Sequence, residues 1–138
     1  MYFDYFAHKA AALTQADYVS AASALAYPSL IYRGPRLIVL SNPGQTVRAL
    51  KAYRTALCAQ GYVRTEAHVT DKMVSAAGTQ TRNWVTWTHL DQTGEVLRTV
   101  DTCHYCSGIG EDVKTMMVDI LSPLDAHAGY FNAASRAT

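Results

Sequence analysis

The chain has 138 residues, 49% of them hydrophobic and 17% charged, with 12 basic side chains against 11 acidic ones. This length favours one domain with one core, and the near-zero net charge argues against binding to nucleic acid or to an anionic membrane surface. No apolar run approaches the ~20 residues that cross a bilayer, and polar residues interrupt the first ten positions, so we expect a cytoplasmic protein without a signal peptide.

The N-terminal segment predicts two helices. Apolar residues recur at helical spacing within residues 2–27, with a break at residues 14–17. The dipeptide Tyr27-Pro28 predicts the end of the second helix, because the residue before a proline disfavours the helical conformation.

Two short strands and a third helix are predicted next. Apolar runs at residues 30–32 and 36–40, separated by a Gly-Pro turn signal, predict the strands. Asn42 followed by a proline predicts the start of the third helix, and Gly61 predicts its end.

After Gly61 the apolar pattern changes from helical to extended. Turn residues separate four extended runs, which predict consecutive hairpins at residues 62–76, 82–90, 95–106 and 113–121. Helices followed by an antiparallel meander predict an α+β fold. We expect one domain over residues 1–122, with residues 123–138 as a C-terminal tail or lid.

This order of elements resembles the nuclear transport factor two-like, or SnoaL-like, superfamily of cystatin-like α+β cones, which includes ketosteroid isomerases. The short motifs that carry the resemblance are Ala16-Asp17, the Ala-Tyr-Arg of residues 52–54 and the Thr-Val-Asp-Thr-Cys of residues 99–103. The resemblance implies N-terminal helices packed on a strongly curved antiparallel sheet that forms a cone with one pocket. It also implies a homodimer that pairs through the outer face of the sheet.

Asp101 is the main candidate for chemistry. By the resemblance, it corresponds to the aspartic acid that stays protonated in ketosteroid isomerases and donates a hydrogen bond to a developing enolate. Alternation along the strand places Asp101 on one face with Leu97, Thr99, Cys103 and Tyr105. The resemblance implies that three residues of the last strand face the same cavity, namely Met116, Val118 and Ile120. The alternative is a structural carboxylate that is paired with a cation or exposed at the rim.

The other polar positions of an isomerase are only partly retained. By the resemblance, Tyr53 corresponds to a tyrosine that supports the oxyanion hole, whereas Arg33 stands in place of the general base and Lys9 in place of a second tyrosine. A guanidinium does not accept a proton at neutral pH, so we do not expect steroid isomerisation. If both cations point inward, they either pair with Asp101 or hold a ligand carboxylate or phosphate.

The histidines and cysteines give weaker signals. Cys103 and Cys106 lie three positions apart in a predicted strand, so their side chains should point to opposite faces, and we expect no metal or redox site. His104 is out of phase with Asp101 and should face the outer surface. The direction of His89 is open, which keeps it a candidate proton carrier.

Three functions remain open. The leading hypothesis is a homodimer that uses no cofactor and binds a small, partly apolar molecule, either neutral or anionic. The expected polar contacts are Asp101, Tyr53 and Arg33. The second is an isomerase- or dehydratase-type enzyme that uses Asp101 and His89 for proton transfer. The third is a non-catalytic dimeric accessory module. An Asp101 side chain that points to solvent would argue against the first two hypotheses.

Overall fold

The computed structural model describes residues 4–122, and in it each α-helix begins at a residue whose side chain caps it. Asp4 accepts a hydrogen bond from the backbone of the first turn of α1 (Tyr5–Thr14), and Asp17 does the same for α2 (Tyr18–Ser23). Asn42 caps α3 (Pro43–Cys58), whose first residue is a proline. No helix among the described residues is long and apolar enough to span a membrane.

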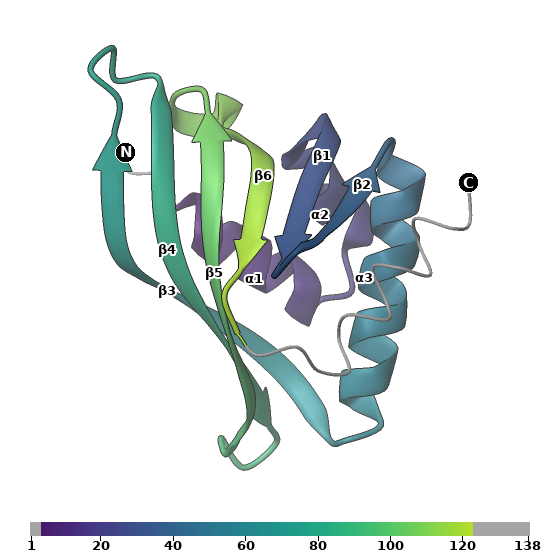
Figure 1. The fold of residues 1–138 in the computed structure, drawn as a ribbon. Helices are drawn as coiled ribbons and strands as arrows, with labels where there is room; N and C mark the ends of the chain where they lie inside the picture. Colours follow the sequence, from purple (N-terminus) through teal and green to yellow (C-terminus); the bar gives the residue numbers. More distant parts are fainter. Residues whose placement is uncertain (1–3, 123–138) are drawn as a thin grey trace.

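Six strands form one open, mixed sheet. They are β1 (Leu25–Arg33), β2 (Arg36–Leu40), β3 (Tyr62–Val74), β4 (Gln80–Asp91), β5 (Val96–Ser107) and β6 (Lys114–Ile120), and a 3-10 helix, η1 (Gly110–Asp112), precedes β6. Their order across the sheet is β2-β1-β6-β5-β4-β3 (Figure 1). The hairpins from β3 to β6 confirm the predicted meander.

Two expectations about the first strand are wrong. The second helix ends at Ser23, and β1 begins at Leu25, before the proline that was predicted to stop the helix. This early start is held by the last strand, because Leu25 pairs with Thr115. The sheet is also not fully antiparallel, since β1 and β6 run parallel. No hairpin joins these two strands, and a long connection permits parallel pairing.

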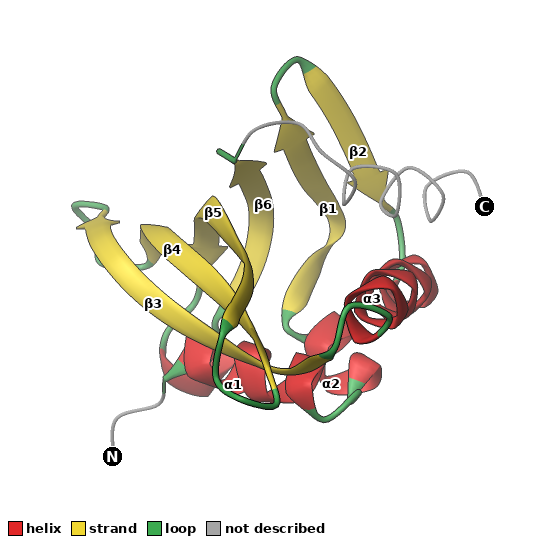
Figure 2. Cartoon of the chain, turned by 90° about the horizontal axis from the view of Figure 1, so that it is seen from below, coloured by secondary structure: helices red, strands yellow, loops and turns green. Residues whose placement is uncertain are grey.

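The helices lie on one side of the curved sheet (Figure 2). The long strands carry register shifts in the β3–β4, β4–β5 and β5–β6 pairs, and such bulges increase the local bend and twist. Three groups of buried apolar residues fill the space between helices and sheet, one around Ile31 and Ile120, one around Phe6 and one around Tyr53. This confirms the predicted α+β fold of helices on a strongly curved sheet.

Candidate functional site

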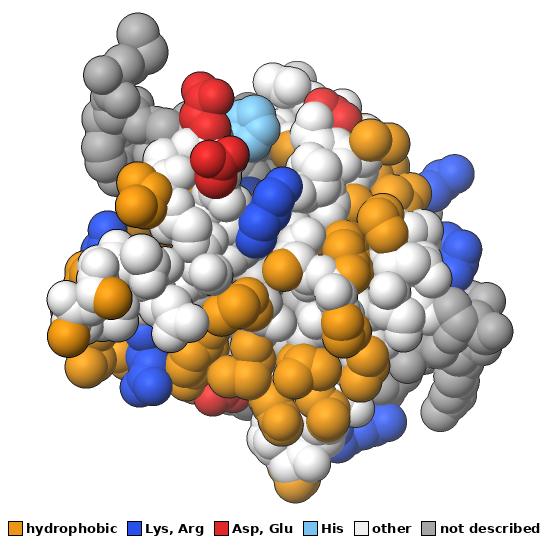
Figure 3. All heavy atoms as spheres, turned by 90° about the horizontal axis from the view of Figure 1, so that it is seen from above, with side chains coloured by type: hydrophobic (Ala, Val, Ile, Leu, Met, Phe, Trp, Pro, Cys, Tyr) orange, Lys and Arg blue, Asp and Glu red, His pale blue; other side chains and the backbone are white. Residues whose placement is uncertain are grey.

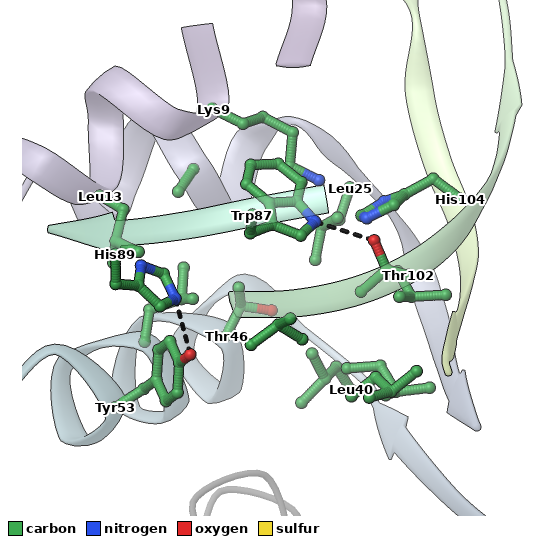
Figure 4. Close-up of a pocket in the computed structure, with 16 residues that line it drawn as sticks. Lys9, Leu13, Leu25, Leu40, Thr46, Tyr53, Trp87, His89, Thr102 and His104 are labelled. Atoms are coloured by element: carbon green, nitrogen blue, oxygen red, sulfur yellow. Dashed lines mark hydrogen bonds between the residues drawn. The ribbon is translucent and has the colours of Figure 1, made fainter. Parts of the chain in front are cut away.

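A cavity of about 160 Å³ lies among the helices and the inner face of the sheet. All three helices and every strand except β3 contribute to its lining (Figure 4). Most of the lining is apolar. The polar or ionisable side chains in it are Lys9, Thr46, Tyr53, His89, Thr102 and His104. The tail or lid expected at residues 123–138 lies outside the described residues.

At one end of the cavity, His89 is held by hydroxyl groups on both ring nitrogens. Its Nε2 lies 2.8 Å from the Tyr53 hydroxyl, and its Nδ1 lies 2.8 Å from Thr65 Oγ1. Thr65 Oγ1 in turn lies 2.6 Å from the Tyr62 hydroxyl. The His89 residue is 2% exposed. These four side chains form a buried hydrogen-bonded chain that ties α3, β3 and β4 together.

At the other end, Lys9 enters the cavity from α1 and points toward Trp87 and His104 (Figure 4). Lys9 Nζ lies 5.3 Å from the centre of the Tyr5 ring and 6.0 Å from the centre of the Trp87 ring. Its hydrogen-bond contact is a long one, 3.5 Å, to Thr115 Oγ1. Within residues 4–122 no carboxylate pairs with Lys9. Loss of hydration on burial lowers the pKa of Lys9 to about 8.

His104 is the polar group of the cavity whose hydrogen bonds are not made. The residue is 4% exposed, and both ring nitrogens are buried without a hydrogen-bond partner among residues 4–122. Its ring packs against Phe6 and Trp87, with centres 5.2 and 5.5 Å away. Burial, and then the nearby charge of Lys9, lower the pKa of His104 well below its ordinary value. The imidazole is therefore neutral at pH 7, with one donor and one acceptor available.

Trp87 lies between these two ends of the cavity and has a hydrogen-bond partner of its own. Its indole nitrogen donates to Thr102 Oγ1 at 2.8 Å, and Thr102 Oγ1 donates to the Val85 carbonyl at 3.1 Å. The polar atoms of Trp87 and Thr102 are thus already bonded within the protein, and Thr46 Oγ1 accepts from the Tyr27 hydroxyl at 2.9 Å. Lys9 and His104 are the lining groups with the most unused bonding capacity for a bound molecule.

Asp101 does not face the cavity, and the prediction that it does is wrong. The side chain is exposed on the outer face, where Thr86 Oγ1 donates to Asp101 Oδ1 at 2.7 Å. Leu97 packs inside as expected, but a bulge there shifts the register between β4 and β5. The extra residue reverses the alternation, so Val100 and Thr102 line the cavity instead. The side chain is exposed, as in the alternative, but on the outer face of the sheet and not at the rim.

A register shift also changes which residues of the last strand, β6, line the cavity. Val118 and Ile120 line the cavity as predicted, whereas Met116 does not. The register between β5 and β6 shifts at Met116, so that Thr115 takes the inward position next to Tyr5. The prediction that Met116 contacts a ligand therefore finds no support in its position.

Of the other predicted site residues, Lys9, Tyr53 and His89 line the cavity and Arg33 does not. Arg33 is 1% exposed and shares the buried side of β1 with Ile31. Because Asp101 points outward, neither Arg33 nor Lys9 serves as its partner inside the cone. The structure joins Tyr53 to His89 rather than to Asp101.

His104 is the residue that the sequence placed on the wrong side. It was expected on the outer surface because it alternates with Asp101, and the two side chains do lie on opposite faces. The sequence did contain a signal for the correct orientation. Where two sets of side chains alternate along a strand, the set that contains a carboxylate more often faces water. Cys103 and Cys106 also lie on opposite faces, with Cys106 in the core around Phe6 and Cys103 near Arg82 and Tyr105. The described residues contain no group of three or more potential ligands placed to hold a metal ion.

Solved structures share this architecture at low sequence identity. A cystatin-like domain of unknown function from Nostoc punctiforme is 11% identical, with a TM-score of 0.67, and the match covers 97% of this chain and 82% of that one. An NTF-2-like protein of unknown function from Shewanella oneidensis is 8% identical, with a TM-score of 0.61 and coverage of 84% and 92%. The chain has the cystatin-like, NTF-2-like fold.

A third structure with this fold was solved with a small molecule. It is a hypothetical protein from Catenulispora acidiphila with a ketosteroid isomerase-like fold, in complex with trimethylamine; it is 10% identical, with a TM-score of 0.55 and coverage of 96% and 95%. No family model matches the chain, and no curated protein matches it. The comparisons therefore support the NTF-2-like fold and identify no ligand for this chain.

Proposed function

We propose that this NTF-2-like chain binds a small, mainly apolar molecule whose single polar group is a hydrogen-bond acceptor held between Lys9 and His104. The observation that carries the proposal is the buried His104 ring, whose two nitrogens have no partner among residues 4–122. A buried polar group without a partner destabilises the fold by about 1–3 kcal/mol. A ligand that supplies the missing hydrogen bond recovers that energy.

The cavity volume sets the size of this molecule. A volume of about 160 Å³ is close to that of an engineered apolar cavity of about 150 Å³ that admits benzene. Pockets for drug-sized ligands are typically about 300–1,000 Å³. We therefore expect a molecule of one ring or of similar size, and not a steroid.

Lys9 determines the charge that the cavity accepts. An ammonium group without a carboxylate partner favours a carbonyl or carboxylate oxygen and repels cations. The trimethylamine of the Catenulispora structure is therefore not carried over to this chain, because its protonated form would meet Lys9. Asp101 and Arg33 are not part of the proposed contact, since neither lines the cavity. Because Asp101 points to solvent, the expected binding through Asp101 and Arg33 loses its support together with an Asp101-based isomerase or dehydratase, and the proposed binding rests on Lys9 and His104 instead.

Trp87 provides a direct test, because it lines the cavity while Trp84 lies on the outer face beside Arg82. In the Trp84→Phe variant, tryptophan emission reports on the cavity alone. We expect benzyl alcohol, benzaldehyde and benzoate each to give a saturable change in this emission. Lys9→Met in the same background should weaken benzoate binding by about tenfold, since a hydrogen bond to a charged group contributes about 1.5–3 kcal/mol.

The matched control is Lys51→Met, which removes a lysine from the exposed surface of α3 and should leave binding unchanged. Absence of any saturable signal with all three compounds at millimolar concentration would overturn the proposal. So would binding of benzoate that is equally tight with and without the Lys9 ammonium.

We also propose that a second copy of the chain covers the outer face of the sheet. The Arg82 guanidinium lies 4.7 Å from the Tyr105 ring centre and 6.0 Å from the Trp84 ring centre. Asp101 and Asp119 lie on the same face as Arg82, so two copies related by a two-fold axis could pair charges of opposite sign across it. Arginine and aromatic residues are also enriched in protein interfaces. Figure 3 views the molecule from above Figure 1 and not onto this outer face; in that view hydrophobic side chains gather over part of the surface.

Self-association is tested by light scattering coupled to size-exclusion chromatography. We expect a dimer for the wild type and a monomer for Trp84→Lys, because an ammonium group would be buried beside Arg82 of the outer face. The control is Val19→Lys, at an exposed apolar position on α2 away from the sheet. A monomeric wild-type protein at tens of micromolar would count against a dimer on this face.

A further inference from the structure

We propose that Lys9 forms an imine with a small, apolar aldehyde or ketone bound in the cavity. This inference rests on the proposed function, because the carbonyl compound has to occupy the cavity first. It goes further by assigning a covalent step to one side chain and by naming the functional group of the ligand.

The surroundings of Lys9 favour the neutral amine more than water does. Its Nζ has no carboxylate partner among the described residues and one long hydrogen-bond contact, to Thr115 Oγ1. The Tyr5 and Trp87 rings attract the ammonium form, but the loss of hydration on burial is larger, and it lowers the pKa of Lys9 to about 8. Desolvation in an apolar pocket is one of the ways in which proteins turn a lysine into a nucleophile.

A carbonyl compound fits these groups better than an anion does. A bound carboxylate has about four lone-pair sites. Lys9 and the N–H of His104 can give each of its oxygens a donor, but most of the remaining wall is apolar, so the other lone pairs would have few donors. A carbonyl oxygen needs only one donor.

His104 is placed to carry the proton. Lys9 and His104 both lie against Trp87, and the charge of Lys9 lowers the pKa of His104, so the two groups are electrostatic neighbours. The His104 ring is neutral and has an unused donor and an unused acceptor within the described part of the chain. It can therefore accept a proton from nitrogen and return one to oxygen without changing its own charge overall.

The step balances with these groups alone. The neutral Lys9 Nζ attacks the carbonyl carbon; the C–N bond forms, and the π pair of the carbonyl moves to oxygen. His104 takes a proton from nitrogen and delivers it to that oxygen, which gives a neutral carbinolamine. The nitrogen lone pair then expels the hydroxyl group, which leaves as water with the second nitrogen proton, and an imine remains on Lys9. Carbon and nitrogen keep their oxidation states, so no oxidant or reductant takes part.

The rate of this step should rise with pH through about 8, where Lys9 loses its proton. The titratable groups that face Lys9 are Tyr5 on its own helix and His104 and Cys106 from the sheet, whereas His89 lies at the opposite end of the cavity. Burial raises the pKa of Tyr5 and of the Cys106 thiol, and it lowers the pKa of His104. Near pH 8, Tyr5 and Cys106 therefore stay protonated and His104 stays neutral.

The experiment is reductive trapping with benzaldehyde and sodium cyanoborohydride, which converts an imine into a stable benzyl amine. Intact mass and peptide mapping identify the modified lysine. Because the neutral fraction at pH 7.5 is on the order of a hundredfold higher for Lys9 than for an ordinary lysine, we expect Lys9 to be labelled at least about tenfold faster than Lys51. Excess benzyl alcohol, which fits the cavity but forms no imine, should slow labelling of Lys9 and not of Lys51.

Two further measurements separate the covalent step from binding. Lys9→Arg cannot form the imine, so it should lose the adduct. Binding itself is measured with Lys9 in place, as the change that benzyl alcohol causes in Trp87 emission of the Trp84→Phe variant. If benzyl alcohol binds but Lys9 is labelled no faster than Lys51, the imine inference fails and the proposed binding function stands. If neither compound reaches the cavity, both fail together.

Discussion

Each end of the cavity contains a buried histidine, but only one of the two histidines has its hydrogen bonds made within the described part of the protein. At one end, both nitrogens of His89 are hydrogen-bonded to hydroxyl groups of Tyr53 and Thr65. At the other, the His104 nitrogens have no partner among residues 4–122, and Lys9 has no carboxylate beside it. The two histidines are almost equally buried, at 2% and 4% exposure. Burial alone therefore does not distinguish a structural histidine from one that is available to a ligand; the hydrogen bonds do.

Replacement of His89 is the largest effect that this difference predicts. His89→Leu should lower the free energy of unfolding by about 2–4 kcal/mol, because the buried hydroxyls of Tyr53 and Thr65 each lose a partner. Urea unfolding at pH 7.5 measures this change. His68→Leu, at an exposed histidine on β3, is the control and should stay within about 0.5 kcal/mol. Equal effects of the two substitutions would show that the hydroxyl chain does not stabilise the fold.

The next effect concerns Lys9 and depends on pH. Its folded-state pKa of about 8 lies below the ordinary value of 10.5, so the unfolded chain binds more protons between these pH values, and stability rises with pH across that window. Lys9→Met removes the buried ammonium and should stabilise the protein by roughly 2 kcal/mol at pH 7.5. This advantage should shrink as the pH rises from 8 toward 10. If the stability gained by Lys9→Met does not change with pH, protonation of Lys9 is not its cause.

His104→Leu should act in the opposite direction to His89→Leu. Removal of an imidazole whose hydrogen bonds are not made should raise the free energy of unfolding by about 1 kcal/mol at pH 7.5. Because the folded-state pKa of His104 is lowered, the wild type loses stability as the pH falls below 6.5, and the variant should lose less. Unfolding curves at pH 7.5 and 5.5 test both statements. A loss of stability as large as that of His89→Leu would remove the contrast between the two ends.

The smallest effect is expected at Asp101. Asp101→Asn keeps an oxygen that can accept from Thr86 on the exposed face, so the free energy of unfolding should change by less than about 0.5 kcal/mol. Binding of benzoate, followed by Trp87 emission in the Trp84→Phe background, should be unchanged as well. A large loss of benzoate binding would instead show that Asp101 takes part in ligand binding.

Much of the fold could be predicted from the sequence because its signals are local. Turn residues and the change of apolar period located the four meander strands within a few residues of their observed ends, as with residues 62–76 for β3 (Tyr62–Val74). Asn42 with the proline after it marked the start of α3 correctly. The start of β1 at Leu25 was not predictable in this way, because it depends on pairing with β6, which lies about ninety residues further along the chain.

The candidate site was predicted only in part, and the errors concern which residues of a strand face the cavity. Lys9, Tyr53, His89, Val118 and Ile120 line the cavity as expected or as left open. The resemblance placed Asp101 and Met116 inside without the bulges that shift the register, and His104 was placed outside because it alternates with Asp101. A single extra residue in one strand reverses every following side chain.

The sequence by itself determined the order of the elements and the two sets of side chains that alternate along each strand. Local preferences of capping, turn and apolar residues act over a few positions, and a sequence records them directly. Only the tertiary structure decided which set faces the cavity, because bulges arise from pairing between strands. It also decided that His89 finds hydroxyl partners while His104 does not, since those partners come from other segments of the chain.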